Sequence, residues 1–273
     1  MRRIINIRPG RGGRLVLGVL PLIVVILCYL TASTARHAEN PRDKILPTAA
    51  AMAEAVQTMA FTVDPLTGQV PLVADTGASL RRLAIGLAIS TAITLVLGMI
   101  LGLLPTMRAG FGPLVATIAV IPPMALLPIL FIVFGLGETS KIVLIVVGIT
   151  PFMVRDLASH IAAIPEEQIV KAQTLGASTW QTAVRVALPL ALPRLIDTVR
   201  LSLGPAWVFL ISAEAIAADV GLGYRIFLVR RYLAMDTILP YVAWISFLAV
   251  IIDFLLLTLS RRAFGWAHPA RSR

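Results

Sequence analysis

The sequence has 273 residues, of which 58% are hydrophobic and only 14% are charged, and its mean hydropathy is +0.89. Soluble domains carry roughly 25% charged residues, so the composition and the apolar runs of bilayer length predict a membrane protein. The net charge of +10 does not indicate nucleic-acid binding, because the basic residues lie between apolar runs and form no face with aromatic residues. The single cysteine, Cys28, excludes a disulfide within the chain.

The first predicted element is a membrane span that follows a basic N-terminus. Residues 1–14 contain five arginines and no acidic residue, and residues 15–32 form an uninterrupted apolar run. A signal peptide begins similarly, but this run is long for one and no convincing small-x-small cleavage site follows it. We therefore predict an uncleaved first span whose N-terminus lies in the cytoplasm.

Residues 33–79 are too polar to cross a membrane and are predicted to lie on its extracytoplasmic side. Within this segment, residues 49–60 indicate a short amphipathic helix. The sequence from Asp64 to Gly68 has Asp, Pro and Gly in the positions that a turn uses.

The next two predicted spans are residues 83–104 and 113–135, joined by a short cytoplasmic loop at residues 105–112. Three glycines in the first of these spans permit close approach of another helix: Gly86, Gly98 and Gly102. Three prolines interrupt the other span: Pro122, Pro123 and Pro128. A broken helix at membrane depth is tolerated where protein or a water-filled cavity covers its freed carbonyls. The proline region is therefore a candidate wall of a translocation path, and a simply kinked span is the alternative of equal weight.

Three further spans are predicted, at residues 142–154, 195–218 and 237–260, and six spans in total place both termini on one side. The first of the three is short and must borrow residues 155–161 to cross fully. Residues 220–224 break the helix after the fifth span.

The fifth span supplies three further candidates for lining the path: Trp207, Ser212 and Glu214. A carboxylate at the bilayer centre costs ~2.5–3.5 kcal/mol on insertion scales, so it faces a bundle interior or a cavity. A structural ion pair of Glu214 with an arginine, for example Arg225 or Arg200, is the alternative. Asp253 in the sixth span is predicted to be a packing or pairing residue.

No catalytic or metal centre is visible in the sequence. The three histidines, at positions 37, 160 and 268, are far apart, and residues 135–141 lack the spacing of a phosphate-binding loop. The chain is therefore predicted to have no ATPase, metal or cofactor of its own.

The polar stretch at residues 164–193 interrupts the apolar runs. Pro165 suits the first position of a helix, Gly176 allows that helix to end, and Ser178 can cap a second helix that extends to about Val186. Proline cannot continue a helical hydrogen-bond ladder, so Leu188-Pro189 is predicted as the turn back into the membrane. A short helix across the membrane face is suited to a groove on a partner protein.

The spacing of this stretch resembles the EAA loop of ABC-importer permeases, which is the coupling helix that docks on the ATPase subunit. The positions that correspond to the family loop are Val170, Lys171, Ala172, Leu175, Gly176, Ala177, Val186, Leu188 and Pro189. Val170 and Lys171 stand where the family usually has Glu and Ala, which leaves the docking contacts open.

The resemblance extends over roughly residues 79–266 and is greatest to permeases of the nitrate/sulfonate/taurine type. Supporting segments are residues 79–82, 121–123, 127–128, 175–178 and 221–224. It implies an all-α, polytopic transmembrane bundle of about six spans with the type I ABC importer permease fold. Its core would be residues 80–266, with the coupling loop at 164–193 and a cytoplasmic tail at 267–273.

The same resemblance implies the partners and the location. These are a second permease copy, usually giving a homodimer, two cytoplasmic ATPases that bind Mg-ATP, an extracytoplasmic solute-binding protein, and membrane lipid in the cell inner membrane. Both termini would be cytoplasmic, and ATP would drive alternating access.

The substrate and two rival classes stay open at this point. Residues 61–76 resemble permeases grouped with urea- or guanidine-degrading enzymes, and the acidic Glu214, Asp219 and Asp253 would suit a cation such as guanidinium. A secondary transporter or channel without an ATPase would predict an inverted repeat, and none is evident. A scaffold protein would not need the spacing from Gly176 to Pro189.

Overall fold

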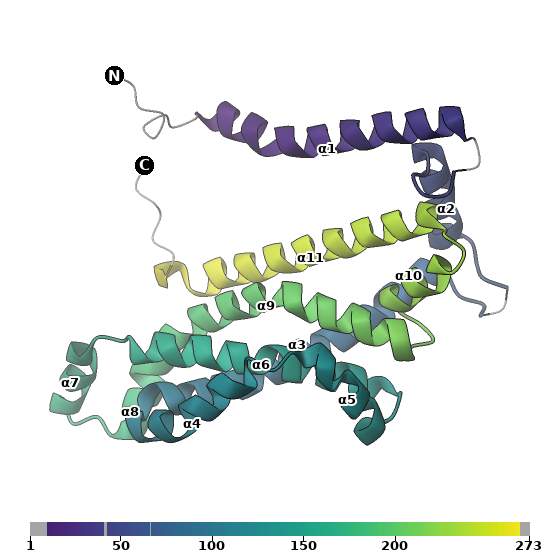
Figure 1. The fold of residues 1–273 in the computed structure, drawn as a ribbon. Helices are drawn as coiled ribbons and strands as arrows, with labels where there is room; N and C mark the ends of the chain where they lie inside the picture. The colour runs from purple at the N-terminus through teal and green to yellow at the C-terminus, as the bar shows by residue number, and fades with distance from the viewer. Residues whose placement is uncertain (1–9, 41–42, 66, 268–273) are drawn as a thin grey trace.

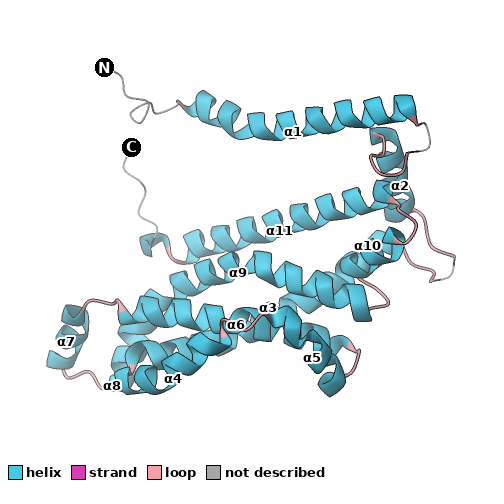
Figure 2. Cartoon of the chain, viewed as in Figure 1, coloured by secondary structure: helices cyan, strands magenta, loops and turns pink. Residues whose placement is uncertain are grey.

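The computed structural model describes residues 10–40, 43–65 and 67–267, and the regular elements in these ranges are all helices (Figures 1 and 2). Five helices are long and apolar enough to cross a membrane, and a bent pair of shorter helices makes a sixth span if it counts as one. The predicted all-α bundle of about six spans is therefore confirmed. Residues 1–9 and 268–273, which include most of the two predicted cytoplasmic ends, lie outside the described residues.

The helices in chain order are α1 (Arg11–Glu39), α2 (Ala49–Phe61), α3 (Pro71–Leu103), α4 (Pro105–Ile118), the 3₁₀ turn η2 (Pro123–Leu126), α5 (Leu127–Phe134), α6 (Glu138–Ala162), α7 (Glu166–Thr174), α8 (Thr179–Thr182), the π-helix η3 (Ala183–Ala187), α9 (Leu188–Ala217), α10 (Leu222–Arg230), α11 (Met235–Ala263) and the 3₁₀ turn η4 (Gly265–Ala267).

The centre of the bundle is the close packing of α3 on α6. A Cβ atom added at Gly86 would lie 2.8 Å from Ile145, and one added at Gly98 would lie 2.8 Å from Leu157. The contacts advance together along both helices, so α3 and α6 run parallel. Small residues let the two backbones approach, as the glycine spacing predicted.

Gly102 makes the tightest of these contacts, since its added Cβ would lie 2.5 Å from Ile161 Cβ. We expect Gly102→Ala to lower the free energy of unfolding by about 1–3 kcal/mol, the usual cost of an overpacked core. Gly110→Ala is the matched control, because nothing lies within 4 Å of its added Cβ. Thermal unfolding in detergent compares the two, and equal stabilities would show that the α3–α6 contact can relax without cost.

Helix α1 lies apart from the other spans (Figure 1). Only 6% of its most apolar window is buried, and its described polar contacts lie near its C-terminal end. There Tyr29 Oη donates to the carbonyl oxygen of Pro47 at 2.7 Å, and Ser33 Oγ donates to that of Leu46 at 3.0 Å. The first span is thus held to the segment before α2 and leaves most of its apolar surface free.

Several helices extend beyond the predicted spans. Helix α3 begins at Pro71, twelve residues before the predicted residue 83, because the polar side chains of its first turns bind partners elsewhere in the bundle. The predicted loop at residues 105–112 is wrong: it is helical, and Pro105 occupies a first-turn position where its missing N–H costs nothing. Helix α6 likewise starts at Glu138, four residues before the predicted span at residue 142.

The turn predicted at Leu188-Pro189 is also wrong. The helix that starts at Thr179 continues through Pro189 and Pro193 to Ala217. The π-helical turn η3 makes this possible, because the N–H of Leu188 bonds to the carbonyl oxygen of Ala183, five residues earlier. Such a bulge supplies the local rearrangement that lets a proline follow within a continuous helix.

The loop that carries α7 and α8 lies at one end of the bundle, and α2 and α10 lie at the other (Figure 1). Helix α1 begins, and helix α11 ends, toward the α7 end (Figure 1). We call the end with α2 and α10 the distal end.

Candidate functional site

Helix α7 ends in a sharp corner that is built on Gly176. The glycine has a φ of +85°, and its N–H bonds to the carbonyl oxygen of Gln173 at 2.9 Å. The N–H of Ala177 bonds to the carbonyl oxygen of Ala172 at 3.0 Å. These two bonds form a Schellman motif, which satisfies the last carbonyls of α7.

Helix α8 begins directly after this corner. The Ser178 hydroxyl accepts from the N–H of Gln181 at 3.2 Å, and Gln181 Oε1 accepts from the N–H of Ser178 at 2.9 Å. The predicted Ser178 cap is confirmed, and Gln181 completes a capping box that the sequence interpretation missed. Two adjacent local motifs therefore fix the angle between α7 and α8.

The corner exposes large apolar side chains. Leu175 is 88% exposed, Trp180 is 76% exposed, and Val170 on α7 is 51% exposed. Exposed side chains of this size, held on a rigid corner, are typical of a protein-docking surface. Trp180 was not among the predicted loop residues, although an aromatic residue just after a helix cap in a polar stretch is a visible signal.

The other predicted loop residues divide between surface and interior. Lys171 and Gly176 are exposed, Ala172 and Ala177 are half-buried, and the later positions lie on η3 and α9: Val186, Leu188 and Pro189. The first six positions thus share the α7–α8 corner, and the last three belong to the helix that leads back into the bundle.

Both ends of the loop are anchored to the bundle. Ile164 packs against the cluster that contains Leu157 and Ile161. Beyond the loop, Arg194 Nε on α9 donates to Asp156 Oδ2 on α6 at 2.9 Å. The loop is therefore joined to α6 and α9.

The predicted path residues divide into a group that reaches the surface, which is the three prolines and Ser212, and a buried pair, which is Trp207 and Glu214. The prolines lie at the break between α4 and α5, where the two halves are bent by 79°, and Pro122 and Pro128 are exposed. Ser212 is half-buried, and its hydroxyl donates to the carbonyl oxygen of Val208 at 2.7 Å. Trp207 and Glu214 lie inside the bundle, 4% and 0% exposed, so neither reaches a surface in this conformation.

Glu214 is fully hydrogen-bonded within the bundle. Its carboxylate accepts from Arg82 Nη1 at 2.7 Å, from Ser79 Oγ at 2.8 Å and from the N–H of Gly223 at 2.9 Å. The ion pair anticipated as the structural alternative therefore exists with Arg82, while Arg225 and Arg200 bind other carboxylates.

Arg225 on α10 binds Asp75 on α3, Nε to Oδ2, at 2.8 Å. Asp75 also accepts from the N–H of Gly221 at 3.0 Å and from Tyr241 Oη on α11 at 3.1 Å. Burial lowers the pKa of Arg225, but the hydrogen bond to Asp75 and the charge of that carboxylate, together with smaller contributions from neighbouring tyrosines, raise the pKa of Arg225 above its ordinary value.

The break between α9 and α10 requires glycine. Gly221 has a φ of +142°, and a Cβ there would lie 2.6 Å from the carboxyl carbon of Glu214. The helix break predicted at residues 220–224 lies at residues 218–221, because α10 already begins at Leu222, and Gly221 packs directly onto the buried carboxylate. Asp253, predicted as a pairing residue, binds Arg200 Nε at 2.9 Å.

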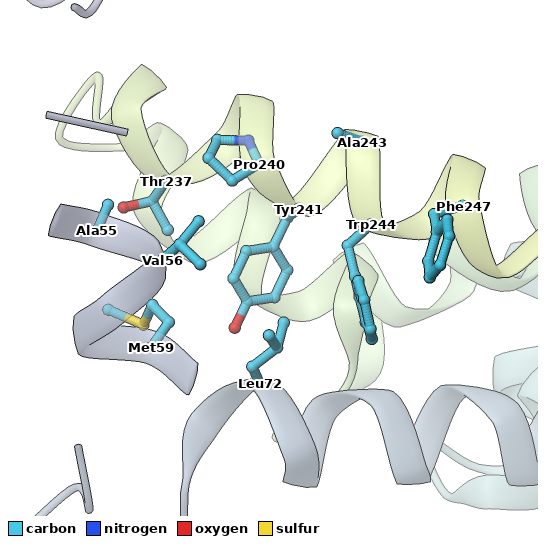
Figure 3. A pocket seen from close by; sticks show the side chains of 10 residues that line it. All are labelled: Ala55, Val56, Met59, Leu72, Thr237, Pro240, Tyr241, Ala243, Trp244 and Phe247. Carbon is cyan, nitrogen blue, oxygen red and sulfur yellow. The ribbon is translucent and has the colours of Figure 1, made fainter. Parts of the chain in front are cut away.

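A cavity of about 360 Å³ lies between α2, α3 and α11 (Figure 3). Its walls are almost wholly apolar, and the polar atoms of Tyr241 and Trp244 are engaged by Asp75 and Thr76. Apart from the hydroxyl of Thr237, its lining offers no group for chemistry. No cluster of His, Cys, Asp and Glu suited to a metal ion occurs among the described residues either.

The described residues form a helical bundle with five or six candidate membrane spans and a structured corner at one end. Residues 81–272 match the family described as binding-protein-dependent transport system inner membrane component, and the chain belongs to that family. It is a multi-pass inner-membrane permease subunit of an ABC importer; the ATPase of such a system is a separate subunit, and the permease is not itself an enzyme.

Curated relatives include several ABC permeases. The chain is 36% identical over 189 residues to the taurine transport system permease protein TauC of Escherichia coli, covering 69% of each chain. It is 30% identical over 149 residues to the nitrate import permease protein NrtB of Synechococcus elongatus, covering 54% of this chain and 53% of that one. A putative aliphatic sulfonates transport permease of Escherichia coli, SsuC, is 32% identical over 151 residues, covering 55% and 57%.

Two solved structures share the fold. The MetNI methionine ABC transporter in an inward-facing conformation aligns with a TM-score of 0.62 at 23% identity, covering 70% of this chain and 95% of that chain. A bacterial alginate ABC transporter aligns with a TM-score of 0.60 at 16% identity, covering 91% and 94%. The type I importer permease fold predicted from the sequence agrees with both.

Proposed function

We propose that this permease moves a small polar solute inward by alternating access, driven by a separate ATPase that docks on the α7–α8 corner. The observation that carries the proposal is the corner itself. Leu175 and Trp180 expose apolar surface on a segment whose direction is fixed by a Schellman motif and a capping box. Burial of both side chains in a groove of the ATPase would remove that surface from water.

This proposal sets the orientation in the membrane. The corner must face the cytoplasm, where ATP is available, so the ends of α1 and α11 that lie toward it are cytoplasmic as well. The distal end, with α2 and α10, then faces outward and meets the solute-binding protein. The basic N-terminus before α1 agrees with this orientation.

The permease is proposed to work as a homodimer, with the path between two copies. The exposed prolines at the α4–α5 break and the half-buried Ser212 are the predicted path residues that reach the surface of one chain. Trp207 and Glu214 support the path from inside the bundle. A second copy would supply the opposite wall.

The solute is proposed to be a small oxyanion of the sulfonate or nitrate kind. Relatives are named for taurine, aliphatic sulfonates and nitrate. A guanidinium-like cation was suggested by Glu214, Asp219 and Asp253. Glu214 binds Arg82 and Asp253 binds Arg200, so of the three only Asp219, which is exposed, would attract a cation with its full charge. Competition of unlabelled taurine, nitrate and guanidinium for uptake distinguishes these solutes.

The experiment that tests the ATPase partnership is purification of the tagged permease in mild detergent. Recovery of an ATPase in stoichiometric amount supports the importer mechanism. A permease that purifies alone and still moves solute into ATP-free vesicles would favour a secondary transporter instead.

Trp180→Ala is expected to weaken ATPase binding by about 2 kcal/mol or more, as truncation of a docked tryptophan usually does. Trp266→Ala is the matched control, because Trp266 is also well exposed, at 58%, but lies near the end of the described chain on η4. The ATPase retained at increasing salt and detergent measures the difference. Equal retention by both variants would place the docking contact elsewhere.

A further inference from the structure

Arg82 joins three segments at the distal end of the bundle. From α3, its Nη1 donates to Glu214 Oε1 on α9 at 2.7 Å and to the carbonyl oxygen of Val220 at 2.8 Å. Its Nε and Nη2 donate to the two carboxylate oxygens of Glu138 on α6 at 2.6 and 2.7 Å. The planar guanidinium makes this double connection possible, since a lysine could not reproduce the bidentate contact.

The two carboxylates differ in how easily they could part from Arg82. The side chain of Glu214 is 0% exposed, whereas that of Glu138 is 54% exposed. Separation of Arg82 from Glu214 would leave a buried charge without a partner, which is strongly unfavourable. A released Glu138 would be hydrated and would keep Lys141, whose Nζ lies 3.0 Å away. Its separation from Arg82 would leave Nε and Nη2 of the buried guanidinium without that partner, so it costs free energy, but less than separation of two buried charges.

The Glu138 contact holds the segment that bends at the prolines. Glu138 is the first residue of α6 and follows the short turn from α5. That turn contains Gly135, which has a φ of +73°, and Gly137. Glycine allows wide backbone movement, so the α5–α6 turn could change direction once Glu138 is free. Glu214 and Val220, by contrast, keep the α9–α10 break fixed to α3.

We propose that the Arg82–Glu138 pair is a latch that opens and closes during the transport cycle, with the Arg82–Glu214 pair as its permanent anchor. Closed, it positions the α5–α6 turn against α3 at the distal end. Open, it lets that turn and the adjoining α5 move relative to α9 and α10. The latch rests on the proposed function, because the ATPase supplies the energy for the cycle.

The test places spin labels at Leu136→Cys in the α5–α6 turn and at Tyr232→Cys after α10, in a chain with Cys28→Ser. Both sites are well exposed, 64% and 71%, and tolerate a label. Distances between the labels are measured in the permease–ATPase complex, first without nucleotide and then with ATP trapped. We expect two distinct distance distributions for the wild-type latch. Glu138→Gln, which breaks the latch but leaves Glu214 bound, should show the open distribution in both states.

The matched control is Asp197→Asn, which removes another partly exposed partner of an arginine, at 34% exposure and 3.2 Å from Arg200. It should keep both wild-type distributions and the wild-type uptake per ATP hydrolysed, while Glu138→Gln should lose uptake per ATP several-fold with an unchanged melting temperature. One distribution in every state of the wild type, or wild-type distances and uptake in Glu138→Gln, would overturn the latch.

Failure of the proposed function is seen separately, as absence of the ATPase from the purified sample. In that case the wild type and Glu138→Gln are compared as purified permeases alone. Identical distance distributions would still overturn the latch, because the pair would then not hold the turn.

Discussion

Arg82→Met should lower the free energy of unfolding by about 3–5 kcal/mol, the usual effect of removing one partner of a buried ion pair. The variant leaves the carboxylate of Glu214, which is 0% exposed, without its cation. Adding Glu214→Leu should restore a substantial part of the loss, because replacement of both charges by apolar groups is often neutral. Glu138 then keeps Lys141, so the net charge of the cluster stays balanced.

Arg200→Met is the control for this prediction. Its partners Asp197 and Asp253 are 34% and 43% exposed, so loss of the cation should cost less than about 1 kcal/mol. The fraction of permease that stays folded and monodisperse in detergent after heating measures each variant, and the Arg82 and Glu214 pair completes a double-mutant cycle. Equal losses for Arg82→Met and Arg200→Met would mean that water reaches the Glu214 cluster.

The spans could be predicted from the sequence because apolar length is a local property. Helix α3 was shortened in that prediction because its first turns carry Asp75, Ser79 and Arg82, which are polar enough to indicate a loop. Their partners lie far along the chain, between 56 and 166 residues away. A single sequence does not show such pairs, so neither the full length of α3 nor the Arg82 cluster could be predicted.

The α7–α8 corner was predicted better, because its signals are also local. Gly176 and Ser178 are neighbours in sequence, and the motifs that they form extend over a few residues. The continuation of the helix through Leu188-Pro189 could not be predicted, since the general rule against proline in a helix is overridden by the π-helical turn before it. The start of helix α4 at Pro105, by contrast, could have been predicted, because proline is common at the first position of a helix.

Gly176→Val should abolish ATP-driven uptake while leaving membrane insertion and the helix bundle intact. Nothing lies within 4 Å of an added Cβ, so the effect arises from the backbone alone. A φ of +85° costs an ordinary L-residue about 1–2 kcal/mol, and β-branched valine tolerates it least. The corner would relieve this strain by losing its Schellman motif. Loss of the motif would change the position of Leu175 relative to Trp180.

Uptake and ATP hydrolysis in proteoliposomes, measured on the same preparation, check this expectation. Gly176→Asn should retain most of the activity, because asparagine adopts the left-handed conformation more readily than other non-glycine residues. Gly110→Val should behave as wild type, since Gly110 is also exposed with nothing near its added Cβ but has no positive φ. If the uptake activity of Gly176→Asn exceeds that of Gly176→Val, the loss is caused by the backbone conformation at the corner. Full uptake by Gly176→Val would mean that the ATPase does not act through it.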